Sequence, residues 1–441
     1  MIEAVPVETA METTCCIAGG GPAGMMLGLL LAREGVDVTV LEKHADFFRD
    51  FRGDTIHPST LDLIDQLGLR EKFLRIPQDS ITTLDVVVGG TRLTPVDFGT
   101  LGGPNKRIAL MPQWDFLDLL AQEARKLDNF HLLMETEATG LLHDGPAASS
   151  PAASSPAPSS PAASSPAVPA VCGVLAQAPG GALRITAPLT VAADGRASLL
   201  RDAAALRPET LGVPIDVLWF RLPTPPSPPP DTLGYLRHGT MLITIPRTGY
   251  YQMGMLIPKG GFAQIRSDGL PAFRQRIRTS APFLAQAVES LLDWEEVKLL
   301  SVQLDRLKQW SVPGLLCIGD AAHAMSPVFG VGVNYAVQDA VAAARLLASP
   351  LLTGLPTDEA VRRIQRRREW PVRLMQPLQQ QVHKIVSGAS AASLDSMPWW
   401  QARLSTLGSR AARPVMARLV GRGFLPERLR GLPAAQTSHV S

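Results

Sequence analysis

A short run of glycines constrains the fold of this chain more than any other feature of its sequence. Residues 19–24 carry the pattern GxGxxG and separate an apolar segment, 14–19, from a segment with helical spacing, 22–34. A further apolar segment, 36–42, has the length of a strand. Strand, helix and strand in this order form a βαβ unit, whose two strands lie parallel. We therefore expect an α/β fold that begins with a Rossmann-like unit.

Each glycine of this pattern has a physical reason to be there. Gly19 makes the turn after the strand, Gly21 lets the backbone approach a pyrophosphate, and Gly24 allows the helix to pack closely on the strand. Ala23 lies in the same first turn, whose N–H groups and helix dipole attract the anion. Glu42 ends the second strand and can bind ribose hydroxyls, which argues against a 2′-phosphate there. The alternative for Glu42 is a structural acid that caps the strand.

The composition excludes several classes of function. The chain has 42 Lys and Arg against 40 Asp and Glu, so no surface for nucleic acid is indicated. Its four cysteines lack the spacing of a metal site, and we expect none. No basic residue precedes the first apolar run, which glycines and a proline interrupt. We expect a cytoplasmic protein with reduced thiols and no membrane span.

The pattern of elements changes in the second half of the chain. Alternating strands are expected at 215–222, 240–245 and 250–257, and the last two form a hairpin. A strand at 315–318 and a helix at 332–348 then return to the α/β pattern. An antiparallel sheet is therefore expected as an insertion in the first domain, and helices rich in arginine complete the chain.

One segment has the composition of a disordered loop. Residues 146–170 repeat Ala, Ser and Pro and have no side chain large enough to offset the entropy of ordering. Strands are expected soon after it, so we interpret it as an enlarged turn in a small antiparallel sheet. A linker between domains is the alternative.

Three motifs occur in a characteristic order. After residues 19–24 come Asp194-Gly195, at the end of an expected strand, and Gly319-Asp320, within the segment LLCIGDAAH. Together they resemble the FAD-dependent aromatic hydroxylases, the class A flavoprotein monooxygenases of the p-hydroxybenzoate hydroxylase type. The resemblance implies that Asp320 contacts the ribityl chain of FAD and that Asp194-Gly195 binds FAD and the nicotinamide cofactor. Taken singly, Asp320 could cap a helix, and Asp194-Gly195 could form a turn.

The same resemblance extends to the surroundings of the cofactor. Arg52 lies in a segment similar to the one that touches the FAD diphosphate, and Gln113 resembles a glutamine that contacts the flavin. The alternatives are a surface arginine and a residue that caps a helix. The helix that begins near Gly332 is similar to the one whose N–H groups, here of Val333 and Asn334, face the pyrimidine end of the ring and stabilise its negative charge when reduced.

The substrate side is less well marked. By resemblance, Pro327 and Phe329 of the loop before this helix and Tyr251 of the hairpin are candidates for the substrate pocket. Phe329 replaces the glycine common in the family, and Tyr251 could equally be a core tyrosine. We name no catalytic acid or base, because His323 is expected to pack and hydrogen-bond locally. The arginines at 362–368 are expected on a solvated face.

The resemblance also implies a division into domains and a reaction. The FAD-binding domain would take residues 11–82, 106–207 and 288–345, the substrate-binding β-sheet domain 83–105 and 208–287, and the C-terminal helical region 346–441. NADH or NADPH would reduce FAD, O2 would form a C4a-hydroperoxide, and its distal oxygen would hydroxylate a phenolic or polyketide-like aromatic molecule.

Other functions remain open at this point. The same flavin peroxide could perform a Baeyer–Villiger or another oxidative tailoring reaction. A flavin halogenase would usually show a Trp-x-Trp-x-Ile-Pro segment, which this chain lacks. A non-enzymatic flavin sensor is a further alternative. The sequence does not define the substrate, the choice of nicotinamide cofactor or the oligomeric state.

Overall fold

The computed structural model describes residues 9–48, 55–88, 90–144, 169–226, 234–389 and 399–429. Arg52 and nearly all of the predicted loop 146–170 lie outside these residues.

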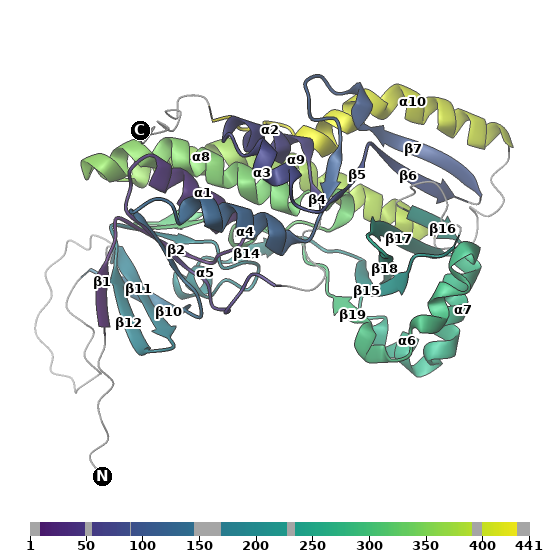
Figure 1. The fold of residues 1–441 in the computed structure, drawn as a ribbon, viewed down its shortest axis with the longest axis horizontal. Helices are drawn as coiled ribbons and strands as arrows, with labels where there is room; N and C mark the ends of the chain where they lie inside the picture. The colour runs from purple at the N-terminus through teal and green to yellow at the C-terminus, as the bar shows by residue number, and fades with distance from the viewer. Residues whose placement is uncertain are drawn as a thin grey trace, which may run out of the picture.

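A mainly parallel sheet forms the first layer of the molecule (Figure 1). Its strands lie in the order β21-β22-β13-β2-β3-β9, and neighbours pair in parallel except for β21 with β22. The bounds are β2 Cys15–Ala18, β3 Val38–Leu41, β9 Phe130–Leu133, β13 Leu189–Ala192, β21 Ser311–Val312 and β22 Leu315–Cys317. The α/β class and the βαβ unit at the start of the chain are confirmed, because α1 (Pro22–Arg33) connects β2 to β3.

Helices and a small sheet cover the two faces of this layer. Helix α1 packs against α4 (Gln113–Ala124) and α8 (Gly332–Thr353) on one face. The small sheet has the order β1-β12-β11-β10 and lies on the other side of β2 in Figure 1. Its strands are β1 Thr9–Glu12, β10 Glu137–His143, β11 Val171–Ala178 and β12 Gly181–Thr186. Strands β10 and β11 pair antiparallel on either side of residues 146–170, as predicted.

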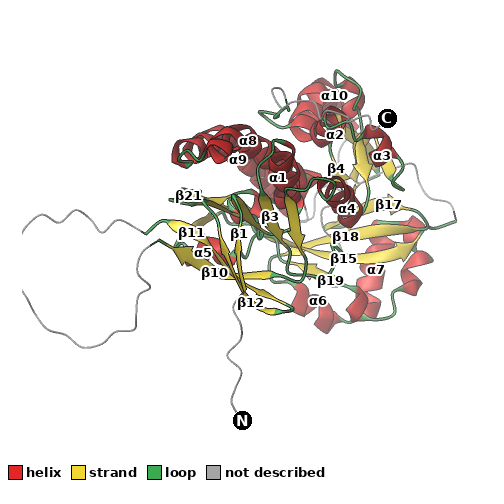
Figure 2. Cartoon of the chain, turned by 60° about the vertical axis from the view of Figure 1, so that its left-hand side comes forward, coloured by secondary structure: helices red, strands yellow, loops and turns green. Residues whose placement is uncertain are grey.

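A second, mainly antiparallel sheet has the order β19-β15-β18-β17-β16-β6-β7, in which β16 and β6 pair in parallel. The predicted hairpin is present, since Arg247 of β17 pairs with Tyr250 of β18. Helices α6 and α7 lie against one face, and α10 packs on β7 (Figures 1 and 2). The bounds are β6 Thr83–Val88, β7 Thr91–Asp97, β15 Ile215–Pro223, β16 Gly234–Arg237, β17 Thr240–Arg247, β18 Tyr250–Pro258, β19 Lys298–Leu300, α6 Phe262–Asp268, α7 Leu270–Ser280 and α10 Trp399–Arg422.

Shorter elements connect these layers. They are β4 Thr55–Ile56, β5 Asp79–Ile81, β8 Ile108–Leu110, β14 Pro208–Thr210, β20 Asp305–Leu307, α2 Pro58–Gln66, α3 Arg70–Leu74, α5 Leu199–Ala203 and, among the described residues, six short 3-10 turns, Phe98–Thr100, Pro282–Leu284, Ala287–Ser290, Trp294–Glu296, Gly319–Ala321 and Val328–Gly330. The long helix α9, Asp358–Ala389, packs on α8. Among the described residues, no helix combines the length and the apolar character that a membrane crossing requires.

Period-2 alternation gives the second sheet two apolar faces. Leu222, Tyr251 and Met253 belong to a buried cluster that continues into α7. Trp219 and Ile245, on the opposite face, belong to another cluster that includes residues of β7, β8 and α10. Phe329 packs against this second cluster, so the loop before α8 meets the face of the sheet that does not carry Tyr251.

The arginine-rich segment of α9 is only partly solvated. Arg362 and Arg366 are exposed and pair with Glu359, as expected for a solvated face. Arg368, in contrast, is 1% exposed, so the prediction is wrong for this residue. The physical reason is a buried carboxylate, Asp339 of α8, whose Oδ1 atom accepts a hydrogen bond from Arg368 Nε at 2.9 Å.

Candidate cofactor site

Four segments singled out from the sequence meet at one edge of the parallel sheet. Residues 19–21 follow β2, Glu42 follows β3, Asp194-Gly195 follows β13, and Gly319-Asp320 follows β22. These strands lie side by side and run in the same direction, so their carboxyl ends share an edge. Ligands of open α/β sheets bind at such an edge.

The glycines of the first turn differ in what surrounds them. Gly19 has φ +109°, and a Cβ on Gly24 would lie 1.9 Å from the carbonyl oxygen of Gly19, so the fold itself requires both. A Cβ on Gly21 would meet no atom within 4 Å. Gly21 precedes α1, whose first turn contains no acidic side chain. The open space beside Gly21 therefore suits an anionic group held by helix N–H groups.

Glu42 is buried next to this turn. Its Oε2 atom accepts a hydrogen bond from the Gly20 N–H at 3.2 Å, and its Oε1 atom accepts one from the His44 N–H at 3.0 Å. A carboxylate at the end of this strand is a group that can accept hydrogen bonds from ribose hydroxyls. The contacts are also those of a structural acid at the end of a strand, so the two interpretations of Glu42 are compatible.

The two aspartates of the later motifs have different environments. Asp194 Oδ2 accepts the Leu200 N–H at 3.3 Å, while its buried Oδ1 has no hydrogen-bond partner among the described residues. Burial raises the pKa of Asp194 despite the N–H groups that favour its charged form. Asp320 is about one-third exposed, and Arg196 Nη2 lies 3.2 Å from its Oδ2 atom. Arg196 follows Gly195 in the segment that carries the Asp194-Gly195 motif, but it was not among the predicted site residues.

A buried carboxylate supports the Gly319-Asp320 turn from behind. Asp339 Oδ2 accepts the Gly319 N–H at 3.1 Å and lies 2.6 Å from His323 Nε2. Burial raises the pKa of Asp339, but His323 and Arg368 outweigh this effect and hold the pKa below its ordinary value. The prediction that His323 hydrogen-bonds locally is confirmed. The sequence contained a signal for this cluster, because an aspartate within the apolar run of α8 needs a buried partner.

The start of α8 lies beside the same edge. Gly332 opens the helix, and no acidic side chain stands in its first turn. The Asn334 side chain is turned to α2, where its Oδ1 accepts hydrogen bonds from the His57 N–H at 3.1 Å and Thr60 Oγ1 at 2.6 Å. Its backbone N–H and that of Val333 belong to the first turn, whose donors have no acceptor within a helix.

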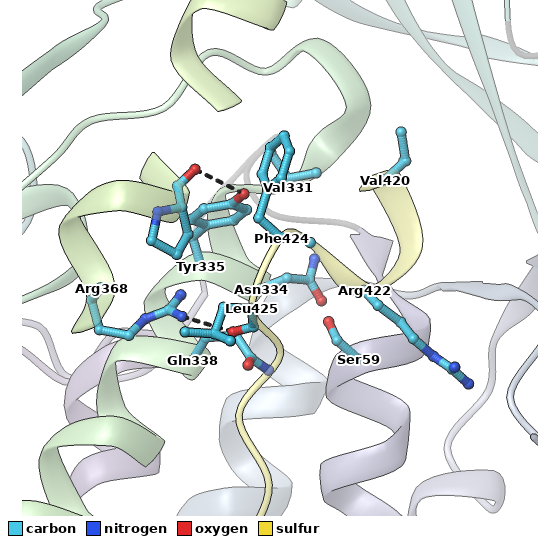
Figure 3. Close-up of a pocket in the computed structure, with 12 residues that line it drawn as sticks. Ser59, Val331, Asn334, Tyr335, Gln338, Arg368, Val420, Arg422, Phe424 and Leu425 are labelled. Atoms are coloured by element: carbon cyan, nitrogen blue, oxygen red, sulfur yellow. Dashed lines mark hydrogen bonds between the residues drawn. The ribbon is translucent and has the colours of Figure 1, made fainter. Parts of the chain in front are cut away.

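A small pocket lies beside the first two turns of α8 (Figure 3). Asn334, Gln338 and Arg368 line it together with the segment that follows α10, including Phe424 and Leu425. No residue of the motifs at 19–24, 194–195 or 319–320 lines it, so we assign neither cofactor nor substrate to this pocket.

Two further predicted residues are placed by the structure. Gln113 opens α4 and is partly buried, in agreement with its expected place at the start of a helix. Tyr251 lies in the cluster beneath α7, and its ring centroid is 6.5 Å from that of Phe283. This packing does not support the prediction that Tyr251 points toward a substrate, because the loop with Phe329 contacts the other face of the sheet.

Two buried histidines near this site predict a pH-dependent stability. Burial lowers the pKa of His57 and of His383 from 6.5 to about 4. Between these values the unfolded chain binds protons that the folded protein excludes, so stability falls as the pH drops from about 6.5 to about 4 and then levels off. We expect a loss of up to ~3 kcal/mol per histidine. The free energy of unfolding of wild type and of a His57→Asn/His383→Gln variant, measured with urea across this pH range, checks the prediction. If this free energy changed equally with pH in both proteins, the prediction would be refuted.

Comparison with known proteins identifies the family. The sequence matches the family described as FAD binding domain over residues 12–155 and 168–368. It is 31% identical to the 6-methylpretetramide 4-monooxygenase of Streptomyces rimosus over 352 residues, 78% of either chain. The structure of PqsL, a probable FAD-dependent monooxygenase from Pseudomonas aeruginosa, superposes with a TM-score of 0.68 at 20% identity and covers 91% of this chain and 100% of PqsL.

A second solved structure agrees in fold. The OxyS anhydrotetracycline hydroxylase of Streptomyces rimosus gives a TM-score of 0.69 at 19% identity, over 93% of this chain and 76% of OxyS. At these identities the structural matches show the fold alone, while the match to the family covers most of the chain. The chain therefore belongs to the FAD binding domain family and is a FAD-dependent monooxygenase with relatives of the aromatic hydroxylase type.

Proposed function

We propose that this monooxygenase uses NADH or NADPH and O2 to hydroxylate an aromatic, phenolic or polyketide-like small molecule. One observation carries the proposal: the three motif segments converge at one sheet edge, and the nearby loop before α8 packs against one face of the second sheet. The name of the 6-methylpretetramide 4-monooxygenase supports an aromatic polyketide as substrate.

The residues at the edge fit FAD. The open space at Gly21 suits the diphosphate, and the Glu42 carboxylate at the end of β3 suits ribose hydroxyls. The Asp194 Oδ1 atom, buried without a partner in the described structure, and Asp320, about one-third exposed, offer acceptors for further hydroxyls. Gly19, Ala23, Gly24, Gly195 and Gly319 shape these turns, and Arg52 and Gln113 remain proposed contacts. Bound and reduced FAD supplies the activation of O2.

The protein itself stabilises charge on the flavin ring and excludes water from the reacting atoms. Backbone N–H groups of Gly332, Val333 and Asn334 at the start of α8 would stabilise negative charge at the pyrimidine end of the ring. Phe329 and Pro327 stand in the loop before it and would exclude water from the reacting atoms. No acid or base is assigned for the substrate.

We assign the substrate to the second sheet, within residues 83–105 and 208–287, on the face that meets Phe329. Trp219 and Ile245 lie on that face, and the register places Gln252 opposite Ile245. The Gln252 amide is 3% exposed and donates a long hydrogen bond of 3.4 Å to a backbone oxygen, so a substrate oxygen could replace that acceptor. The remaining residues would form the FAD-binding domain and the C-terminal helical region.

The two faces of β18 predict different kinetic effects. Gln252→Leu removes a donor on the face toward Phe329 and is expected to raise KM for the aromatic substrate about 3- to 10-fold. Tyr251→Phe, on the face beneath α7, is expected to leave KM unchanged. Steady-state kinetics of both variants checks this contrast. An increase of KM in Tyr251→Phe alone would move the substrate to the other face.

The proposal is tested by product analysis. The FAD-loaded protein is incubated with NADH or NADPH against a panel of phenols and polycyclic quinones, and oxygen incorporation is followed by mass spectrometry. We expect at least one aromatic compound to stimulate NAD(P)H consumption and to gain one hydroxyl oxygen. Ring expansion to a lactone or ester, or a flavin that neither nicotinamide reduces, would overturn the proposal.

A further inference from the structure

The loop that leads into α8 contains an unusual backbone conformation. Phe329 has φ +68° and ψ −6°, in the left-handed region that a residue with a Cβ rarely adopts. Gly330 follows with φ +64°. A side chain persists in this region only where its surroundings determine the conformation. The surrounding contacts should therefore show what holds residues 326–330 in place.

An amide from α9 makes three hydrogen bonds to the beginning of this loop. Gln379 Oε1 accepts the Ser326 N–H at 3.3 Å. Gln379 Nε2 donates to the carbonyl oxygens of Ser326 at 3.1 Å and of Val328 at 3.0 Å. Backbone N–H groups can only donate and carbonyl oxygens can only accept, so these partners fix the orientation of the amide. Gln379 is fully buried and makes no other hydrogen bond in the described structure.

A histidine one turn further along α9 holds the same serine. His383 Nε2 lies 2.7 Å from Ser326 Oγ, and both residues are buried. Ser326 Oγ also accepts the Val328 N–H at 3.1 Å. The serine hydroxyl therefore connects His383 with the backbone of the loop, and its O–H is available to donate to Nε2 of the neutral ring.

The other end of the loop is fixed by β4. Thr55 Oγ1 donates to the Gly330 carbonyl oxygen at 3.0 Å. Between the two ends, the Phe329 ring packs against the cluster of the second sheet and against a cluster that includes Val372 and Met375 of α9. Contacts from β4 and from α9 thus fix the conformation of the loop. The contacts from α9 come from a helix that contains none of the FAD motifs.

We propose that Gln379 and His383 are positioning residues for the flavin ring. They hold residues 326–330 so that Phe329 and the first N–H groups of α8 keep their places beside the ring, and this keeps NAD(P)H oxidation coupled to oxygenation of the substrate. The inference rests on the proposed function, in which this loop adjoins the flavin. Both residues contact the loop at Ser326, and Gln379 also contacts Val328, so we expect them to act through these two residues.

The test compares two substitutions two residues apart on α9. Gln379→Met removes the three hydrogen bonds at nearly constant volume, and Gln381→Met makes the same exchange at an exposed position. His383→Leu and His383→Gln form a second pair, because glutamine can still reach Ser326 Oγ. Each full-length protein is studied by hydrogen–deuterium exchange of residues 326–332, by visible circular dichroism of bound FAD, and by the hydrogen peroxide formed per NAD(P)H.

We expect the amide hydrogens of this loop to exchange about 10- to 100-fold faster in Gln379→Met and His383→Leu than in wild type. Each lost hydrogen bond should raise the exchange rate several-fold. The dichroism of FAD should change, and the peroxide fraction should rise several-fold, while Gln381→Met and His383→Gln resemble wild type. Equal exchange in Gln379→Met and Gln381→Met would overturn the proposal, as would faster exchange with unchanged dichroism and coupling. Absence of hydroxylated product from wild type would instead refute the proposed function, because exchange and dichroism need no substrate.

Discussion

Gly21→Val should abolish tight FAD binding and leave the apoprotein folded. A Cβ at this position meets no atom within 4 Å, and the backbone of Gly21, at φ −73° and ψ −176°, is one that valine adopts readily. The added methyl groups would fill the space that a diphosphate needs. We expect the Kd for FAD to rise by about 100-fold or more, which corresponds to about 3 kcal/mol. Titration of apoprotein with FAD, followed by flavin fluorescence, measures it.

Gly24→Val is the matched substitution three residues away. Its Cβ would lie 1.9 Å from the Gly19 carbonyl oxygen, so α1 would have to move off β2. We expect this variant to lose at least about 3 kcal/mol of stability with or without FAD. Urea unfolding of both apoproteins separates a blocked ligand from a damaged fold. If the Gly21→Val protein bound FAD as tightly as wild type, the proposal that the diphosphate lies at this turn would be wrong.

The second large effect is expected at the buried charges between α8 and α9. Asp339→Asn removes the charge of the carboxylate that hydrogen-bonds to Arg368 Nε and leaves Glu427, whose Oε1 atom lies 3.7 Å from Arg368 Nη1, as the other buried partner of this guanidinium. The substitution also weakens the support of the Gly319 N–H. Removal of one partner of a buried ion pair costs about 3–5 kcal/mol, and the Glu427 carboxylate that stays beside Arg368 places the expected loss near the lower end, about 3 kcal/mol. We expect that loss in the free energy of unfolding, measured by urea denaturation, together with weaker FAD binding.

An exposed carboxylate on α9 provides the control. Glu359 pairs with Arg362 and Arg366 in solvent, and Glu359→Gln should leave the unfolding midpoint unchanged. The double variant Asp339→Leu/Arg368→Met should recover part of the stability that Asp339→Asn loses, because no charge is left without a partner. If Asp339→Asn were as stable as Glu359→Gln, the buried pair would contribute nothing to the fold.

Patterns within short segments of the sequence were sufficient to predict much of the fold and of the candidate cofactor site. The GxGxxG turn, Asp194 and Asp320 each follow an expected strand. Parallel pairing of these strands then brings the three segments together at one edge of the sheet. The hairpin of β17 and β18 was predictable because alternation and a turn signal lie close in the sequence. These features depend on contacts within a few residues or on the general geometry of parallel sheets.

The remainder depends on contacts between distant segments. Alternation along β18 places Tyr250 and Tyr251 on opposite faces of the sheet but does not tell which face α7 covers. The strand alone therefore could not show which tyrosine faces the substrate. The burial of Arg368 required knowledge that α9 packs on α8 beside Asp339. Similarly, no spacing within α9 reveals that Gln379 and His383 reach Ser326.

The strand order of the first sheet has a consequence during synthesis of the protein on the ribosome. Strand β13 must leave one edge vacant until β22 emerges, because five of the seven strands of the second sheet, β15 to β19, are translated between them. A nascent chain in which β13 already pairs with β2 thus carries an apolar strand with one open edge for the several seconds or more that translation at roughly 5–20 residues per second needs. Such an edge invites pairing with other chains. Good yields on expression should therefore depend on chaperones that shield nascent chains.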